Sequence, residues 1–202
     1  MFVSFKILVS SLLAGLIHLD ILVFGQFMIS RPIVVGGIFG YFLGIPQYGL
    51  LIGVLFELLY IIEIPVGIKV PVDATSSTVF SIVGFEISGC LILSLIFGFF
   101  IGFLYKYVDM LTRSLNSVVL SWVDTAKNEV VIKRINLLIF YGIIFTYLRT
   151  VLFYLISFSS LGYLLCVLCK FLPSRIIFDV HSLISILPAL GIGICINHFL
   201  EK

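Results

Sequence analysis

Charged and amide side chains lie in a stretch of sequence, residues 25–78, that is otherwise apolar enough to enter a lipid bilayer. They include Gln26, Arg31, Glu57, Glu63, Lys69 and Asp73, and the same stretch is broken by Pro32, Pro46, Pro65 and Pro71. Charged groups at membrane depth are costly, and irregular backbone persists there only where it is buried in protein or lines a cavity. Short apolar segments broken by proline and glycine also point to a binding site within a membrane. These residues therefore predict a substrate site built inside a membrane.

Three of these side chains are the strongest candidates for contact with a ligand. Glu57 has only apolar near neighbours, so its carboxylate must face a polar interior, find a cationic partner or be protonated. Asp73 stands where a helix can begin, and an aspartate there can cap free amides or bind a ligand. Gln26 can both donate and accept hydrogen bonds, as a sugar hydroxyl requires. Structural alternatives stay open, because Glu57 could pair with Arg31 or Lys69, and Arg31 could extend to the membrane interface.

The histidines and cysteines give weaker indications of chemistry. His18 and Asp20 could form a proton relay, although a single histidine at the membrane interface is the commoner outcome. Cys166 and Cys169 have the C-x-x-C spacing, but they lie in an apolar run without a second pair, so we expect inert thiols. The sequence also lacks the zinc-protease, nucleophile-elbow and phosphate-loop motifs. We therefore predict no catalytic residue, no metal site and no cofactor.

The composition indicates a membrane protein. Hydrophobic residues make up 61% of the chain and charged residues 11%, whereas about a quarter of the residues are charged in soluble domains. The net charge of +2 gives no indication of nucleic-acid binding. A transmembrane helix needs about 20 apolar residues, and several segments approach that length. We therefore predict an all-α, polytopic membrane protein with broken or re-entrant helices.

Apolar segments separated by prolines and polar residues predict the order of the helices. A membrane-crossing helix is expected at Phe5–Phe24. The next two segments, Pro32–Gly44 and Gln47–Ile64, are expected to form a tilted or re-entrant hairpin. Residues 65–71 should be non-helical, because each of their two prolines removes a donor and clashes with the preceding turn. Further helices are predicted at Ser76–Tyr105, Ile135–Ile156, Ser159–Leu172 and Ser182–Phe199.

A polar connector, residues 106–134, separates two apolar halves. Apolar residues recur in it at near-helical spacing, which predicts an amphipathic helix lying on the membrane surface. Five of the 12 basic residues lie there, namely Lys106, Arg113, Lys127, Lys133 and Arg134. The positive-inside rule therefore places the connector in the cytoplasm, either as a solvated link or as a docking surface. The predicted units are an N-terminal membrane half (1–105), which holds the site segment, the connector (106–134), and a C-terminal membrane half (135–202).

Glycines repeat at four-residue spacing in the predicted hairpin and in the helix that follows it. They are Gly36, Gly40 and Gly44, then Gly49 and Gly53, then Gly98 and Gly102. Small residues at this spacing let membrane helices approach closely. We therefore expect tight helix packing at these positions rather than chemistry.

The motifs of residues 12–81 resemble those of a known membrane family. They are Gln26-Phe27 with Arg31-Pro32, the glycine run, Glu57, Pro65-Val66-Gly67 and Pro71-Val72-Asp73-Ala74. Their order and spacing are similar to those of the enzyme IIC membrane subunit of mannose/sorbose-type phosphotransferase systems, the mannose-fructose-sorbose family. The resemblance is weak beyond Ser81. The chain departs from the family pattern at Ile45-Pro46, where an aspartate is usual, and at Lys69, where a small neutral residue is usual.

The resemblance implies a sugar permease of the bacterial inner (cytoplasmic) membrane that works as an oligomer. Such a subunit works with an enzyme IID-like membrane subunit. It binds a hexose in the membrane and passes it inward for phosphorylation by an enzyme IIAB-like soluble phosphocarrier. The phosphoryl-carrying histidines belong to the soluble partners, so none is expected in this chain. The resemblance assigns sugar binding to Gln26, Glu57 and Asp73 and gives Arg31 and Pro71 a role in shaping the site.

A second interpretation stays open. Relatives of this type extend further beyond the position of Lys202, so the chain could instead be a degenerate enzyme IIC-like scaffold or sensor without transport activity. Sugar uptake separates the two interpretations, because only a permease moves sugar.

Overall fold

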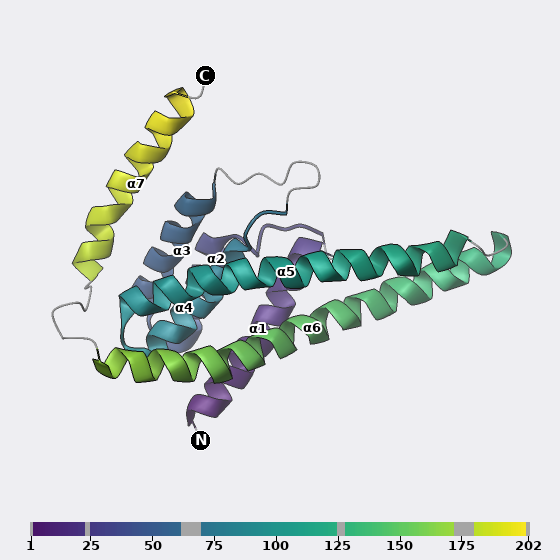
Figure 1. Cartoon of the computed structure of the whole chain (residues 1–202), viewed down its shortest axis with the longest axis horizontal. Coiled ribbons are helices and arrows are strands. Elements are labelled where there is room, and N and C mark those ends of the chain that lie inside the picture. The colour runs from purple at the N-terminus through teal and green to yellow at the C-terminus, as the bar shows by residue number, and fades with distance from the viewer. Residues whose placement is uncertain (1, 23–24, 62–69, 125–127, 172–179, 201–202) are drawn as a thin grey trace.

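In the computed structural model, the residues described are 2–22, 25–61, 70–124, 128–171 and 180–200. These ranges form helices joined by short non-helical segments, and no strand occurs in them. Figure 1 shows the helices α1 (Phe2–Leu22), α2 (Pro32–Leu43), α3 (Pro46–Tyr60), α4 (Ala74–Ser88), α5 (Leu91–Asp124), α6 (Asn128–Phe171) and α7 (Val180–Leu200). The prediction of an all-α fold is therefore confirmed.

Helices α2 and α3 form a hairpin in which glycine brings the two backbones together. Gly44 follows α2 in the left-handed conformation, with φ 80°, and Pro46 begins α3. Gly36 and Gly49 lie so close that a Cβ on either would meet the carbonyl oxygen of the other. With 12 and 15 residues, the helices are about 18 and 22 Å long, shorter than a hydrocarbon core of about 30 Å. These lengths suit the predicted tilted or re-entrant hairpin.

The single helix predicted at Ser76–Tyr105 is divided in two, so that prediction was wrong. Gly89 adopts φ 70° and donates its N–H to Phe85 O at 2.8 Å, which ends α4. Helix α5 begins at Leu91 and runs back along α4, with Gly98 against the α4 backbone. A glycine in an apolar run permits a left-handed cap but does not require one. The sequence therefore did not distinguish a break from a continuous helix.

In the described residues, the surface helix predicted within 106–134 is not a separate element. Helix α5 continues to Asp124 and α6 starts at Asn128, so the stretch supplies the far ends of two long neighbouring helices (Figure 1). No proline or glycine occurs between Phe103 and Tyr141, so nothing breaks α5 near residue 106 or α6 near residue 134. Apolar residues at helical spacing predict that a helix forms, but not where it begins.

The two segments predicted at Ile135–Ile156 and Ser159–Leu172 also form one helix, α6. Ser159 and Ser160 each donate a hydroxyl hydrogen to the carbonyl oxygen four residues earlier, at 2.7 Å. Their polar groups are therefore satisfied inside the helix and do not interrupt it.

Helix α4 lies at the centre of the molecule. Every residue from Thr75 to Gly84 is buried, although half of them carry hydroxyl groups. The helix packs against α1, α2, α3, α5 and α6, and Phe80 lies in a common apolar core with Phe39 and Tyr154. Groups at the start of α4 are therefore held from several sides, which is the main contribution of the fold to the site.

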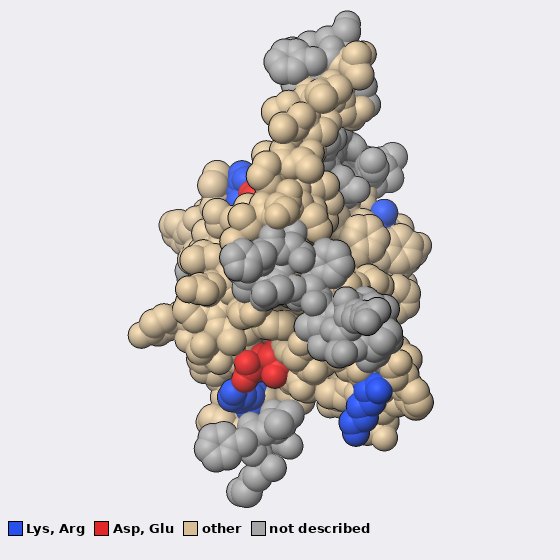
Figure 2. All heavy atoms as spheres, turned by 90° about the vertical axis from the view of Figure 1, so that its left-hand side faces the viewer, with Lys and Arg blue, Asp and Glu red and all other residues tan. Residues whose placement is uncertain are grey.

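The outer surface is largely apolar. Among the described residues, two ranges, Leu91–Ser117 in α5 and Ile135–Phe171 in α6, are long and apolar enough to cross a membrane by length and composition. Figure 2 shows one end of the molecule, where charged residues cover only small areas among uncharged ones. Extensive exposed apolar surface is typical of a protein that contacts lipid.

Candidate functional site

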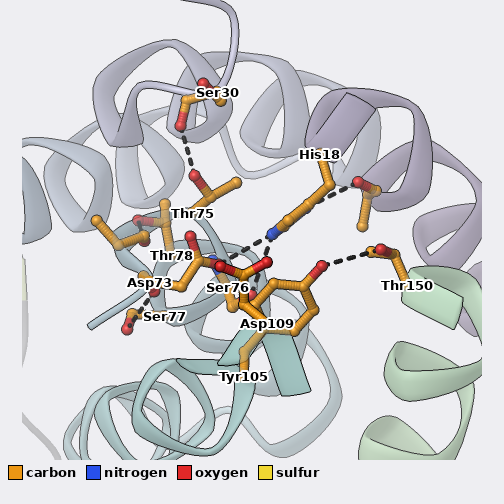
Figure 3. A network of polar contacts seen from close by, with 12 residues as sticks. His18, Ser30, Asp73, Thr75, Ser76, Ser77, Thr78, Tyr105, Asp109 and Thr150 are labelled. Atoms are coloured by element: carbon orange, nitrogen blue, oxygen red, sulfur yellow. Dashed lines mark hydrogen bonds and ion pairs between the residues drawn. The ribbon is translucent and has the colours of Figure 1, made fainter. Parts of the chain in front are cut away.

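Asp73 stands at the start of α4 and caps this helix, as the structural alternative for this residue predicted. Its Oδ2 accepts the N–H of Ser76 at 2.9 Å, which satisfies one of the free amides at the helix start. Its own N–H donates to Gly102 O of α5 at 3.3 Å. The side chain keeps an exposed fraction of 18%. The cap therefore fixes the carboxylate beside α5 within the polar network drawn in Figure 3, and the exposed fraction shows that part of the side chain stays accessible.

His18 of α1 is the second partner of the Asp73 carboxylate. Its Nε2 lies 2.9 Å from Asp73 Oδ2, and its Nδ1 lies 3.0 Å from Ala14 O in the preceding turn. The ring is 1% exposed. The rings of Tyr105 and Tyr154 lie 4.7 Å and 5.6 Å from it, measured between centroids. The imidazole is thus held in one orientation, with a nitrogen on the carboxylate (Figure 3).

Hydroxyl groups extend this polar network into α6. Tyr154 donates its hydroxyl hydrogen to Ser76 Oγ at 2.9 Å, and the hydroxyls of Tyr105 and Thr150 lie 2.9 Å apart. Arg149 Nη2 donates to the Tyr105 hydroxyl oxygen at 3.0 Å. Buried polar groups are costly unless they are hydrogen-bonded, so these contacts hold α4, α5 and α6 in a fixed arrangement around His18 and Asp73.

A cavity of about 150 Å³ opens beside the network. It is lined by His18, Ile21, Val70, Pro71, Val72, Asp73, Tyr105, Lys106, Asp109 and Arg113. Arg113 Nε donates to Asp109 Oδ2 at 2.8 Å on one wall. Carboxylates, cations and an aromatic ring around a small cavity can bind a polar molecule through several hydrogen bonds. Among the described residues, no group of three or more His, Cys, Asp or Glu side chains is arranged to hold a metal ion.

Gln26, a predicted site residue, lies on the loop between α1 and α2. It is exposed, with φ 50°, and it does not line the cavity. The buried carboxylate of Asp20 holds this loop by accepting the N–H groups of Phe27 at 2.7 Å and Ile29 at 2.9 Å. Asp20 is therefore an anchor for the loop and does not form a relay with His18.

Glu57 and Arg31, two further predicted site residues, form an ion pair with Nη1 and Oε1 2.7 Å apart. This is the structural alternative that the sequence left open for Glu57. Next to Arg31 in the chain, Ser30 O accepts the hydroxyl hydrogen of Thr75 at 2.7 Å, so the pair is adjacent to the start of α4. The pair itself lies outside the cavity lining.

The predicted residues thus divide into two groups. Asp73 and Pro71 line the cavity, whereas Gln26, Glu57 and Arg31 do not. Glu63 and Lys69, from the same polar pattern, lie outside the described residues.

Comparison with protein families decides what kind of membrane protein this is. The family model described as the sorbose-specific IIC component of the PTS system matches residues 4–202. The chain belongs to this family of IIC components. The searches of curated proteins and of solved structures gave no match. The resemblance noted over residues 12–81 is therefore confirmed and covers nearly the whole chain.

As a IIC component, the protein is a membrane component of a sugar phosphotransferase system. IIC components in general function with IID and IIAB partners. The family membership agrees with the apolar surface and the all-α fold.

Several charged or aromatic residues that line the cavity of this IIC component were missed from the sequence as site residues, among them Tyr105 and Asp109. Arg149, which donates to the Tyr105 hydroxyl, was missed as well. Arg149 lies in α6 among largely apolar neighbours, which is the signal that singled out Glu57, so that signal could have found it. Asp109 lies in the stretch 106–134, which was interpreted as a polar connector, so its charge did not stand out. Tyr105 carried no such signal, because aromatic residues are common throughout the chain.

Proposed function

We propose that this IIC component is the sugar-translocating subunit of a mannose-type phosphotransferase system, which binds a hexose in the membrane and passes it inward for phosphorylation. One observation carries the proposal, namely a cavity in an apolar helical protein whose lining includes Asp73 and Pro71 together with further charged side chains. A sugar offers several hydroxyl groups, and buried carboxylates bind such groups as hydrogen-bond acceptors. Family membership supports the choice of a sugar over other polar ligands.

Within this proposal, the predicted site residues take two roles. Asp73 contacts the sugar directly, and Pro71 shapes the wall beside it. Gln26, Glu57 and Arg31 meet the sugar outside the cavity, from the loop and the hairpin that adjoin the start of α4. The hydrogen bond between Thr75 and Ser30 supports this arrangement, because it links that loop to α4.

The proposal includes an assembly and a location. The protein would act as a multi-pass subunit of a bacterial inner membrane, together with an enzyme IID-like membrane chain and an enzyme IIAB-like soluble phosphocarrier. The partners supply the phosphoryl group, since no phosphoryl-carrying histidine is expected in this chain.

Sugar uptake by the reconstituted complex tests the proposal. The wild-type subunit, Glu57→Gln and Asp73→Asn are each combined with both partners in vesicles, and uptake and phosphorylation of labelled hexoses are measured. Glu86→Gln is the matched control, because Glu86 lies at the other end of α4 in an ion pair with Lys6. We expect wild type and Glu86→Gln to transport and Asp73→Asn to need about 10- to 100-fold more sugar, since a hydrogen bond to a charged group contributes about 1.5–3 kcal/mol.

Two outcomes of this experiment would contradict the proposal. If no hexose enters with all partners present, the scaffold or sensor interpretation gains. If wild type transports and both site variants equal it, transport stands but the assignment of the site is wrong.

A further inference from the structure

His18 is the one histidine of the chain's three whose side chain the structure describes, and both of its ring nitrogens face oxygen atoms. Nδ1 lies 3.0 Å from Ala14 O, and Nε2 lies 2.9 Å from Asp73 Oδ2. A backbone carbonyl can only accept, so Nδ1 must carry a hydrogen. The protonation of Nε2 then depends on whether Asp73 is ionised.

The surroundings of Asp73 favour the ionised carboxylate. The oxygen that faces His18, Oδ2, also accepts the N–H of Ser76 at 2.9 Å. Asp73 is the N-cap of α4, where the helix dipole stabilises a negative charge. An ionised carboxylate accepts only, so Nε2 must donate as well. A ring that donates at both nitrogens carries both hydrogens, and its contact with Asp73 is then a charged hydrogen bond.

The same contacts leave the two oxygens of Asp73 in different states. Oδ2 receives hydrogen bonds from His18 and from the Ser76 amide. Both of these hydrogen bonds converge on the same oxygen, while the side chain is partly exposed and lines the cavity. Oδ1 is consequently the oxygen that remains for a ligand.

The imidazole is itself held in place. Its contacts with Tyr105 and Tyr154 pack it on two sides, and Tyr154 donates to Ser76 Oγ, which lies 3.2 Å from Nε2. A ring that is fully buried and hydrogen-bonded at both nitrogens has little freedom to turn. It can therefore fix the orientation of the carboxylate that it contacts.

We propose that His18 is a positioning residue for Asp73, whose doubly protonated ring holds Oδ2 so that Oδ1 faces the cavity as the acceptor for a ligand hydroxyl. The inference rests on the proposed function, because the ligand is taken to be a sugar. It assigns to α1 a part in sugar affinity, although α1 lies outside the segment that holds the predicted site residues.

The first test reads the protonation of the ring without any transport. The purified protein, labelled with ¹⁵N-histidine, is examined by NMR, and His181→Gln and His198→Gln identify the His18 resonances. We expect both His18 nitrogens to give signals of protonated nitrogen in wild type, and one of them to become unprotonated in Asp73→Asn. A wild-type ring with a single protonated nitrogen would overturn the proposal.

The second test separates positioning from a structural role. His18→Gln can place an amide donor near the position of Nε2, whereas the shorter side chain of His18→Asn cannot reach Asp73. In the reconstituted complex, we expect His18→Asn to raise the sugar concentration for half-maximal uptake about 10- to 100-fold, and His18→Gln to stay within about threefold of wild type. The maximal rate should change less than the affinity, and the melting temperatures of both variants should match.

The outcomes distinguish this inference from the proposed function. If Asp73→Asn loses affinity while His18→Asn keeps it, Asp73 binds sugar without His18 and only the inference fails. Equal losses of sugar affinity in His18→Gln and His18→Asn would likewise contradict the inference, because only His18→Gln keeps a hydrogen-bond donor near the position of Nε2. If the wild-type complex takes up no sugar, the proposed function fails, and the nitrogen signals alone then decide whether His18 holds Asp73.

Discussion

Asp20 and Asp73 show how two carboxylates in an apolar protein take different roles. Asp20 is buried, and both of its oxygens accept N–H groups of the loop after α1. Asp73 uses one oxygen for both His18 and the Ser76 amide, and its side chain lines the cavity. A carboxylate whose oxygens are all occupied by backbone stabilises the fold, whereas a partly occupied one can still bind a ligand.

This difference predicts a stability ranking at the residue scale. Asp20→Asn should lower the free energy of unfolding by about 1–3 kcal/mol, because buried amides lose a charged acceptor. Glu57→Gln should cost less than about 1 kcal/mol, because its partner Arg31 is 50% exposed and the pair is screened by solvent. Denaturant unfolding in detergent, followed by circular dichroism, measures both. Equal losses of unfolding free energy in Asp20→Asn and Glu57→Gln would contradict the anchoring role of Asp20.

The hairpin of α2 and α3 is the element whose packing depends most directly on residue size. A Cβ on Gly49 would lie 2.5 Å from Gly40 Cα, which is backbone and cannot rotate away. The two helices could accept a side chain there only by moving apart. Because the loop between α1 and α2 leads directly into α2, that movement would also disturb the residues of this loop before Pro32.

At the element scale, Gly49→Ala should therefore lower the free energy of unfolding by about 1–3 kcal/mol, the usual cost of overpacking. Gly142→Ala is the matched control, because Gly142 is in α6 with nothing within 4 Å of a Cβ, and alanine favours a helix by up to about 1 kcal/mol. Thermal melting of both variants in the same detergent makes the comparison. An unchanged melting temperature for Gly49→Ala would refute close contact in the hairpin.

These elements show what the sequence could and could not predict. Glycines at four-residue spacing indicate that two helices approach closely. This local pattern occurs at Gly36 and Gly40 and again at Gly49 and Gly53, so the hairpin was predictable. Gly89 stands alone in an apolar run, where glycine is tolerated with or without a break, so the end of α4 was not. The contact between His18 and Asp73 joins residues 55 apart, and no local spacing encodes it.

At the scale of the whole molecule, two long helices extend well beyond the core around α4 (Figure 1). Helices α5 and α6 have 34 and 44 residues, about 51 and 66 Å, against about 30 Å of hydrocarbon. Their polar far ends are the stretch first interpreted as a surface helix. The helical spacing of apolar residues identified this stretch as helical, but only the packing in the folded protein shows that it continues the helices on either side.

The far ends of α5 and α6 should lie in the cytoplasm, because five basic residues gather within residues 106–134. Ser117 is exposed near the end of the apolar part of α5, so Ser117→Cys in a cysteine-free protein reports the orientation. A maleimide that cannot cross membranes should label it in inverted vesicles and not in intact cells. Labelling in intact cells but not in inverted vesicles would show that these helix ends lie on the opposite side of the membrane.

The most direct test of the account is the affinity of the purified membrane complex for a labelled hexose, measured by equilibrium dialysis. It compares wild type with Asp73→Asn at the cavity and Glu86→Gln at the opposite end of α4. If the cavity is the sugar site, Asp73→Asn raises Kd about 10- to 100-fold and Glu86→Gln leaves Kd unchanged. Wild-type affinity in Asp73→Asn would contradict the account, because the sugar would then bind elsewhere.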